Sequence, residues 1–365
     1  MNVVIVNCFD TYEHRVELLY EYFKKREDNV TVYASDFRHI EKVKRTDVKE
    51  GYIFCTAKPY KKNISVSRMF SHASLAKKIF SILEKREVDL LWVLIPPNSF
   101  VKEAIKLKCK KKEMKLIFDV IDMWPETMPV ERVKNFFPIQ KWKKIRDTGI
   151  GKADYVVTEC DLFQEALKEV VGQKKMSTIY LARECQTFMD KSELEKNRFT
   201  LCYLGSINNI INIPAIEQII KELSKKQPVR LHIIGDGEKR EEFIKNAQAA
   251  GAEVFYHGKI YDKEKKEEIF SKCHYGLNIM KDSVYVGLTM KSVDYFEAGL
   301  PIINNIKGDT WRLVEDYDMG VNFSDLSDVS VEKSIVQRQN ARTFFENKLS
   351  LESFNKSLED VLQKI

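Results

Sequence analysis

The sequence is poor in glycine and proline, which account for 14 and 9 of its 365 residues. With 44% hydrophobic and 31% charged residues, this scarcity excludes collagen-like, low-complexity and disordered proteins. No stretch approaches the ~18 uncharged apolar residues that span a membrane. The N-terminus lacks a basic segment and a small-residue cleavage site, so we expect no signal peptide. At about 100–200 residues per domain, the length predicts two domains.

The cysteines show no pairing pattern. There are seven, an odd number, they are scattered along the chain, and no C-x-x-C motif occurs. This argues against a disulfide framework and against a zinc site. Several lie in apolar runs, where free cysteine packs as a small hydrophobe. We therefore expect a reduced, cytoplasmic protein without a bound metal or other cofactor.

Positive charge is concentrated in one half of the chain. Residues 1–182 contain 34 Lys and Arg against 25 Asp and Glu, a net charge of +9, whereas the remainder has a net charge of −3. The excess is densest at 106–112 and 141–146. These runs could be ordinary solvated helix faces, or they could bind an anionic surface such as phospholipid headgroups. Trp142 favours a membrane interface, and no nucleic-acid-binding motif is present.

Short β-rich apolar runs alternate with amphipathic helical patterns along the whole chain. The run 89–95 is almost continuously apolar, which is typical of a buried parallel strand. The alternation pauses in a polar stretch, restarts at residue 200 and continues to about residue 315. This pattern predicts an α/β protein with two doubly wound, Rossmann-like domains in tandem.

These patterns also predict where the domains begin and end. We expect an N-terminal domain over 1–182, a linker over 183–199 and a second domain over 200–339. Residues 340–365 have the period of one long amphipathic helix, which we expect to pack back towards the N-terminal domain. In such sheets, ligands bind outside the carboxyl ends of the strands. The loops that follow strands are therefore the places to look for a site.

Four such loops in the second domain contain glycine or polar residues. Glycine lets backbone N–H groups approach a phosphate at the start of a helix, although the G-D-G loop could equally be a tight turn. The third loop could offer backbone groups and an apolar lid to a base. The candidate residues are Gly205 and Ser206, Gly235 and Gly237, Lys259 and Ile260, and, in the fourth loop, Met290, Lys291 and Asp294.

The fourth loop, 286–301, predicts an anion site. Lys291 falls in the first turn of the predicted helix, where its charge would add to the helix dipole. Asp294 lies one turn further on, where a carboxylate could hold a pair of vicinal hydroxyls.

The order of these motifs resembles a known family. G-S at 205–206, I-G-D-G at 234–237, H-G-K-I at 257–260 and V-G-L-T-M-K-S-V-D-Y-F-E-A-G-L-P-I-I at 286–303 resemble the C-terminal half of GT-B glycosyltransferases of retaining family 4. The segment D-V-I-D-M-W-P-E at 119–126 resembles the D-x-x-D-x-W-P-E segment of bacterial members that build surface polysaccharides on lipid carriers. The resemblance covers about residues 200–325 well and the N-terminal half more loosely.

The resemblance implies that the C-terminal domain binds a nucleotide-diphospho-sugar, with a UDP-sugar favoured, and that no metal is required. Asp294 replaces the second acid of the family's E-x7-E motif and would bind the ribose hydroxyls. Lys291 would stabilise the leaving diphosphate. Val286 replaces the first acid, which usually contacts the sugar. The family's phosphate-binding cation after the Gly205 loop is also missing, so either Lys291 bears more of that role or a cation of the N-terminal domain contributes.

The resemblance places the acceptor in the N-terminal domain. Our candidate for a general base is Asp122, with Asp119 second, although either carboxylate could instead cap a turn. Ile121 stands where many family members have a histidine. Retaining transfer by front-face attack can also proceed without a strong protein base, because the leaving phosphate can take the proton. The acceptor-side candidates after the first strand are Asp10, Thr11, Tyr12 and His14, of which Asp10 or Thr11 could instead be a helix N-cap.

The sequence thus predicts a metal-independent retaining glycosyltransferase of the cytoplasm and the inner face of the cell membrane. We expect it to extend a lipid-linked glycan in cell-surface polysaccharide synthesis. Two alternatives remain open. One is a catalytically inactive GT-B subunit that assists a partner enzyme, which the residues at Val286 and Ile121 would suit. The other is a GT-B sugar-nucleotide epimerase.

Overall fold

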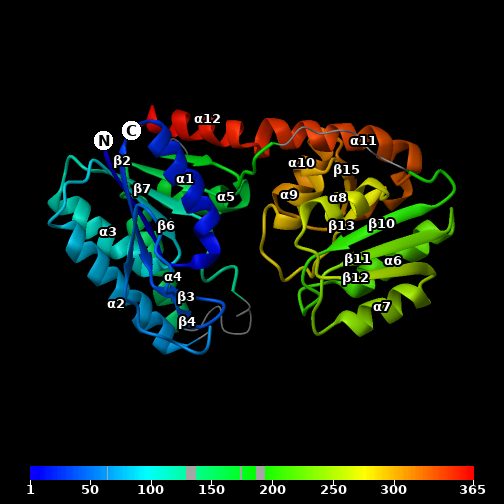
Figure 1. Cartoon of the computed structure of the whole chain (residues 1–365), viewed down its shortest axis with the longest axis horizontal. Coiled ribbons are helices and arrows are strands. Elements are labelled where there is room, and N and C mark those ends of the chain that lie inside the picture. Colours follow the sequence, from blue (N-terminus) through cyan, green and yellow to red (C-terminus); the bar gives the residue numbers. More distant parts are fainter. Residues whose placement is uncertain (64, 129–136, 173–174, 186–193) are drawn as a thin grey trace. The chain divides into compact units, whose positions relative to one another are not determined.

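A computed structural model describes residues 1–63, 65–128, 137–172, 175–185 and 194–365. The chain forms two compact units (Figure 1). The N-terminal unit comprises Met1–Leu181 together with Phe354–Ile365, and the C-terminal unit comprises Ala182–Ser353. Residues 186–193 of the expected linker lie outside the described residues.

The N-terminal unit is built on a parallel seven-stranded sheet. The central strand β6 reads L-L-W-V-L-I and is buried at every position, as expected of a strand covered on both faces. In spatial order the strands are β5 (Tyr52–Cys55), β2 (Asn29–Ser35), β1 (Asn2–Asn7), β6 (Leu90–Ile95), β7 (Lys115–Val120), β8 (Tyr155–Thr158) and β9 (Met176–Thr178).

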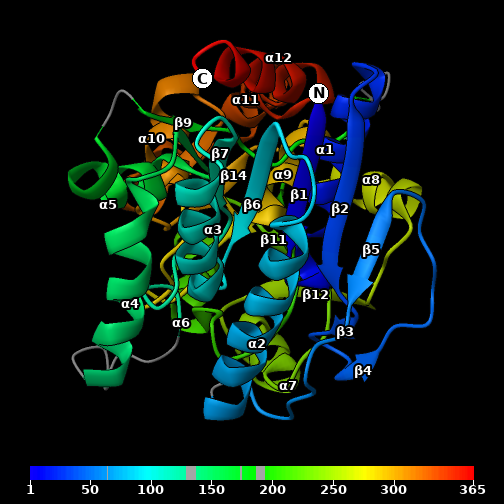
Figure 2. The same ribbon diagram turned by 90° about the vertical axis from the view of Figure 1, so that its left-hand side faces the viewer.

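Helices cover both faces of this sheet. Because the crossovers run in opposite directions on the two sides of β1, right-handed connections put α1 on one face and α2, α3 and α4 on the other. Figure 2 shows the latter three in front of the strands. The helices are α1 (Glu13–Lys25), α2 (Val66–Leu83), α3 (Asn98–Lys110), α4 (Phe137–Ile150), α5 (Asp161–Val171) and α12 (Leu351–Leu362).

The C-terminal unit repeats this topology with a parallel six-stranded sheet. Its core is rich in isoleucine from strands and helices alike. In spatial order the strands are β12 (Ala252–Gly258), β11 (Val229–Ile234), β10 (Phe199–Leu204), β13 (Tyr275–Asn278), β14 (Ile302–Asn304) and β15 (Gly320–Asn322). The α-helices are α6 (Ile213–Ser224), α7 (Arg240–Ala249), α8 (Lys263–Ser271), α9 (Met290–Glu297), α10 (Asp309–Tyr317) and α11 (Val331–Phe344).

Side-chain caps fix where several helices begin. Ser65 accepts a hydrogen bond from the backbone N–H of Arg68 at the start of α2, and Asn212 accepts one from Ala215 at the start of α6. These caps satisfy donors that the helix itself leaves unpaired. They set the first turns of helices that follow strand ends.

Two features differ from the prediction. Residues 340–365 are not one helix, because a π-helical turn at Phe345–Leu349 and the extended residue Ser350 separate α11 from α12. The small antiparallel ribbon of β3 (Phe37–Arg38) and β4 (Val43–Lys44) was not predicted, because its strands are too short to show a period.

The two sheets have the same strand order around their first strands, with a switch point between β1 and β6 in one and between β10 and β13 in the other. Ligands of doubly wound sheets bind at the carboxyl edge beside such a point. The α/β, doubly wound fold predicted from the sequence is confirmed.

Candidate functional site

Lys291 lies in the first turn of α9, which follows the loop that begins after β13. Thr289 caps this helix by accepting a hydrogen bond from the backbone N–H of Ser292 at 3.2 Å. The Lys291 Nζ lies 4.7 Å from the centre of the Tyr203 ring. Burial lowers the pKa of Lys291 to about 8. A partly desolvated ammonium at a helix start is suited to bind a diphosphate.

Asp294 lies one turn after Lys291 and is ion-paired. One carboxylate oxygen is 2.8 Å from Arg183 Nη2 and the other is 4.0 Å from Lys266 Nζ. Burial raises the pKa of Asp294, and both cations oppose that shift. A ribose that binds Asp294 would therefore share it with Arg183. Arg183 lies in the expected linker, and its backbone N–H bonds to the carbonyl of Leu349.

The two glycine loops interlock through their backbones. The N–H of Gly205 donates to Ile234 O, and that of Gly235 donates to Gly258 O. A Cβ added to Gly235 would lie 1.9 Å from the Gly205 carbonyl oxygen, and φ at Gly235 is +145°. Gly235 is therefore needed for close packing of the two loops, whereas at Gly205 the backbone conformation, with φ of +121°, is what favours glycine. The amides of Gly205 and Gly235, which we expected to approach a phosphate, are already used within the protein.

The remaining C-terminal candidates lie around the same edge. Gly237 donates its N–H to Asp236 Oδ1 at 2.9 Å. Ser206 is exposed next to the Gly205 loop, and its carbonyl accepts a bond from the Tyr203 hydroxyl. Lys259 and Met290 are exposed, and Ile260 is partly exposed.

Buried asparagines link three strands at this carboxyl edge. Asn304 donates its side-chain N–H to Asn322 Oδ1 at 2.9 Å and accepts one from Asn278 at 2.9 Å. Thr289, the cap of α9, also donates to Asn278. This asparagine ladder therefore connects β13, β14 and β15 to the helix that bears Lys291.

Asp119, at the end of β7, lies in the core of the N-terminal unit and bonds to residues there. It is fully buried and bonds to Arg15 Nε and Nη2 at 2.8 and 2.9 Å. The indole N–H of Trp92 donates to it as well, at 2.9 Å. A carboxylate held by three donors away from solvent does not suit a general base. We therefore interpret Asp119 as a structural residue and remove it from the candidate bases.

Asp122 follows the same strand and is only partly buried. The indole N–H of Trp124 donates to Oδ2 at 2.7 Å, the Tyr12 hydroxyl approaches the same oxygen at 3.5 Å, and Thr127 donates to Oδ1. Burial raises the pKa of Asp122 while these donors oppose the shift. Asp122 thus remains a candidate base, and the structure places Tyr12, an acceptor-side candidate, next to it.

The other acceptor-side candidates have different surroundings. Asp10 accepts a hydrogen bond from the backbone N–H of His39 at 2.8 Å. Neither Asp10 nor Thr11 caps α1, since a short 3-10 helix at Asp10–Tyr12 precedes it and no side chain caps Glu13–Lys25. That alternative is therefore wrong. Thr11 and His14 are exposed.

Glu159, directly after β8, was missed by the sequence analysis. Its pKa is raised to about 7, chiefly by burial and also by the negative charges of Asp119 and Asp122, against the opposing effect of Arg15. A partly buried carboxyl group whose pKa lies near neutrality at a carboxyl edge is a candidate proton donor or acceptor. Its position after a strand was a usable signal, but its neighbours come from other strands.

The basic runs of the N-terminal unit are largely paired. Lys108 and Lys110 bond to Asp154 and Glu84, and Arg146 is buried against Glu126 and Asp147. In the run 141–146, the exposed members are Lys141 and Lys144. The charge available to an anionic surface is therefore smaller than the sequence count indicated.

The described residues are informative about metal binding and about crossing a membrane. They include no group of three His, Cys, Asp or Glu that could hold a metal ion. Metal-independent activity stays a prediction. Within the same parts of the chain, every helix is too short or too polar to cross a bilayer.

Residues 198–333 match the family model described as glycosyl transferases group 1. Solved structures match the whole chain. A lipopolysaccharide outer core galactosyltransferase, WaaB, has 15% identity and a TM-score of 0.71, over 100% of this chain and 99% of that one. Anabaena HepE in complex with UDP has 12% identity and a TM-score of 0.70, over 100% of both chains. This chain has the GT-B glycosyltransferase fold.

A third GT-B neighbour is a trehalose-6-phosphate synthase, solved in a study of glycosyl transfer with retention. It has 11% identity and a TM-score of 0.65, over 100% of this chain and 99% of that one. At these identities the structures show the fold alone. A search of curated proteins finds no match.

The family match divides the candidate residues into two groups. Lys291, Asp294 and the glycine loops lie inside the matched segment 198–333. Asp122, Tyr12 and Glu159 lie outside it, so their assignment depends on the geometry of the N-terminal unit.

Proposed function

We propose that this GT-B protein transfers a sugar from a UDP-sugar to an acceptor hydroxyl, with retention of the anomeric configuration and without a metal ion. The observation that carries the proposal is Lys291, a partly desolvated cation at the start of α9, inside the segment that matches the family. Its charge would stabilise the diphosphate as the sugar leaves. Asp294, one turn further on, would bind the ribose hydroxyls.

Two neighbours support the donor and the stereochemistry. HepE was solved with UDP and also with UDP-glucose. The trehalose-6-phosphate synthase was studied for transfer with retention. Both are similar to this chain in fold, and the motif at 286–303 resembles that of retaining family 4.

For the acceptor, we propose a lipid-linked glycan of cell-surface polysaccharide synthesis, extended at the cytoplasmic face of the membrane. The neighbour WaaB, whose name describes a lipopolysaccharide outer core galactosyltransferase, supports a glycan acceptor. The exposed residues Lys141 and Lys144 could attract anionic headgroups. The seven cysteines are all free thiols, as is usual in a reducing compartment.

The test of the reaction is direct. The protein is incubated with UDP-glucose, UDP-galactose or UDP-N-acetylglucosamine and a lipid-linked glycan acceptor, in EDTA, and the new anomeric proton is read by NMR. We expect product with the configuration of the donor. An inverted product would remove the retaining assignment, and activity that needs added metal would remove the metal-independent one.

A second candidate is an inactive GT-B subunit that assists a partner enzyme. Val286 stands where the resemblance implies a sugar-contacting acid, and Asp294 is already paired with Arg183. An assay of UDP-sugar hydrolysis without acceptor distinguishes the active transferase from the inactive subunit. Slow hydrolysis of a UDP-sugar that disappears in Lys291→Ala supports the enzyme, whereas UDP binding without any turnover supports the inactive subunit.

A further inference from the structure

A small apolar cavity lies in the N-terminal unit, between the start of α2 and the segment that follows β7. Its volume is about 260 Å³. Its apolar lining includes Val66, Met69, Pro125 and Trp142. A cavity of this size and character accepts part of an apolar molecule rather than a whole drug-sized ligand.

A buried arginine lines this cavity, together with the polar residues Asn63, Ser65 and His72. Arg68 is 4% exposed, and its Nη1 donates to the carbonyl of Asn63 at 2.6 Å. Its Nε and Nη2 have no hydrogen-bond partner among the described residues. Burial lowers the pKa of Arg68. Buried arginines are normally paired with an anion, because an unpaired buried charge is strongly unfavourable.

Aromatic rings stabilise the guanidinium charge of Arg68, but they do not accept hydrogen bonds from its free N–H groups. The Arg68 guanidinium carbon lies 4.2 Å from the centre of a Trp124 ring and 5.4 Å from that of Phe9. Such cation–π contacts stabilise the charge. Tyr60 also lies beside Arg68 and raises its pKa. Within the described parts of the chain, Nε–H and Nη2–H still have no acceptor, and two adjacent guanidinium N–H groups match the oxygens of a phosphate.

His72 adds a second unused polar atom. It is 3% exposed, lines the same cavity, and its Nε2 has no partner among the described residues. Burial lowers its pKa well below the usual value, and the charge of Arg68 adds to that effect. The imidazole is therefore neutral, and its Nε2 can donate to an anion in one tautomer.

The surface beside the cavity is apolar. On α2, Val66 is 67% exposed and Phe70 is 68% exposed. An apolar chain attached to an anion bound at Arg68 could lie along these side chains.

We propose that this cavity binds the phosphate of an apolar-tailed phosphate ester, with Arg68 and His72 as its donors and the exposed side chains of α2 as the track for its tail. The inference rests on the proposed transfer to a lipid-linked acceptor, and it names the site that would hold the phosphate of that lipid. Trp124 connects this site to the candidate base, because its ring contacts Arg68 and its indole N–H donates to Asp122.

Farnesyl phosphate tests the proposal with the full-length protein. Trp142 lines the cavity and Trp124 contacts Arg68, so binding should change the tryptophan fluorescence. We expect farnesyl phosphate to bind at least 10-fold more tightly than farnesol and at least 10-fold more tightly than inorganic phosphate. Equal affinity for farnesol would remove the anion site, and equal affinity for inorganic phosphate would remove the apolar part.

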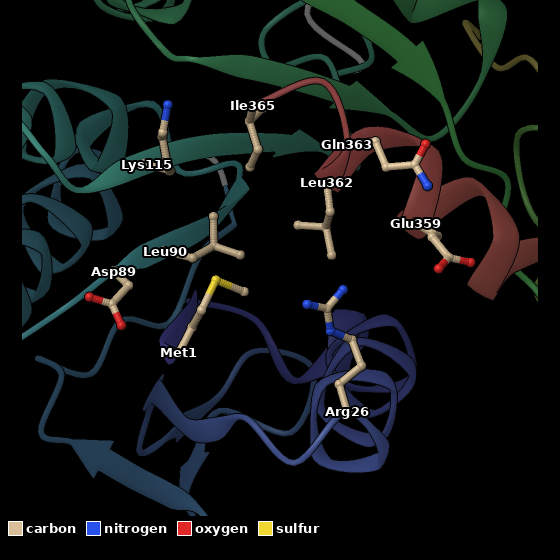
Figure 3. Close-up of a pocket in the computed structure, with 9 residues that line it drawn as sticks. All are labelled: Met1, Arg26, Asp89, Leu90, Lys115, Glu359, Leu362, Gln363 and Ile365. Atoms are coloured by element: carbon tan, nitrogen blue, oxygen red, sulfur yellow. The ribbon is translucent and has the colours of Figure 1, made fainter.

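The chain offers a matched control for Arg68. Arg26 lines a second cavity of the N-terminal unit, with Leu90 and Leu362 (Figure 3), but it is paired with Asp28. Arg68→Gln should weaken farnesyl phosphate by about 10–100-fold, the loss of a charge-assisted contact. Arg26→Gln should leave it unchanged. Unchanged affinity in a folded Arg68→Gln protein would overturn the proposal.

A second variant covers the case in which Arg68→Gln fails to fold. Val66→Glu places a negative charge on the exposed rim and should weaken farnesyl phosphate several-fold without unfolding the protein. No effect of this variant would also count against the site. UDP affinity, measured by calorimetry on the same proteins, reports on the donor site. Loss of farnesyl phosphate with unchanged UDP therefore tests this inference separately from the proposed function.

Discussion

The carboxyl edges of the two sheets have the same topology and opposite chemistry. In the N-terminal unit, this edge contains the carboxylates Asp119, Asp122 and Glu159, of which only Asp119 forms a buried ion pair. In the C-terminal unit, neutral asparagines link the strands, and Lys291 supplies a cation beside them. Strand order thus determines where a site lies, whereas the side chains determine which ligand it suits.

This difference divides the proposed reaction between the units. Carboxyl groups with raised pKa values suit proton transfer at an acceptor hydroxyl. A cation at a helix start suits a diphosphate. Each of the following predictions tests one side of this comparison.

The largest effect is expected at the buried ion pair of the N-terminal sheet. Asp119→Ala leaves Arg15 as an unpaired buried charge, so we expect a loss of about 3–5 kcal/mol in the free energy of unfolding. Urea denaturation measures it. The exposed pair Arg38–Glu41 provides the control, since Glu41→Ala should cost less than about 1 kcal/mol. Similar losses in both variants would contradict the structural role of Asp119.

The second prediction concerns Lys291 at the carboxyl edge of the C-terminal sheet. Lys291→Ala should weaken UDP binding by about 1.5–3 kcal/mol, or roughly 10–100-fold, because a charge-assisted contact is lost. The exposed Lys281 of the same unit is the control, and its alanine variant should bind normally. Isothermal calorimetry compares the two. Unchanged affinity in Lys291→Ala would falsify the donor-site assignment.

The pH dependence of UDP binding follows from the same residue. Since the pKa of Lys291 is lowered to about 8, its ammonium is present at pH 7 and is lost as the pH rises through that value. UDP affinity should therefore fall between pH 7 and pH 9 in the native protein. The fall should be smaller in Lys291→Ala, which has no proton to lose there.

Much of this comparison could be predicted from the sequence. A buried strand such as 89–95 is predicted by its own run of apolar residues. The order of the glycine loops and Lys291 along the chain resembles that of a known family. The pairing of Arg15 with Asp119 joins residues 104 positions apart, so no local pattern reveals it. The same is true of Glu159, whose pKa is raised by burial in the folded protein and by carboxylates from the neighbouring strand β7 and the loop that follows it. The asparagine ladder was missed because each asparagine ends a different strand.

That ladder should contribute measurably to stability. Asn304→Ala leaves the side chains of Asn278 and Asn322 each without one buried partner, and we expect a loss of about 1–2 kcal/mol. Asn29 is the matched control, because its amide also bonds to another asparagine, Asn2, but on the exposed surface. Asn29→Ala should cost less than about 0.5 kcal/mol. Equal losses measured by urea denaturation would show that burial of the ladder is unimportant.

The smallest effect is expected at Glu159 and is visible only as a pH difference. Its pKa is about 7 in the folded protein against 4.5 for an ordinary glutamate, so the folded state holds the proton more tightly than the unfolded state. Stability from this group is therefore present below pH 4.5 and is lost as the pH rises to about 7. Glu159→Gln has no such proton, and its stability relative to the native protein should increase between pH 5 and pH 8 by on the order of 1 kcal/mol, allowing for partial exposure. Urea denaturation at the two pH values measures this change in stability, with Glu165→Gln on the exposed side of α5 as the control.

If the stability difference between Glu159→Gln and the native protein were constant across this range, Glu159 would ionise normally. It would then no longer be a candidate proton acceptor, and Asp122 would be the remaining candidate at that edge.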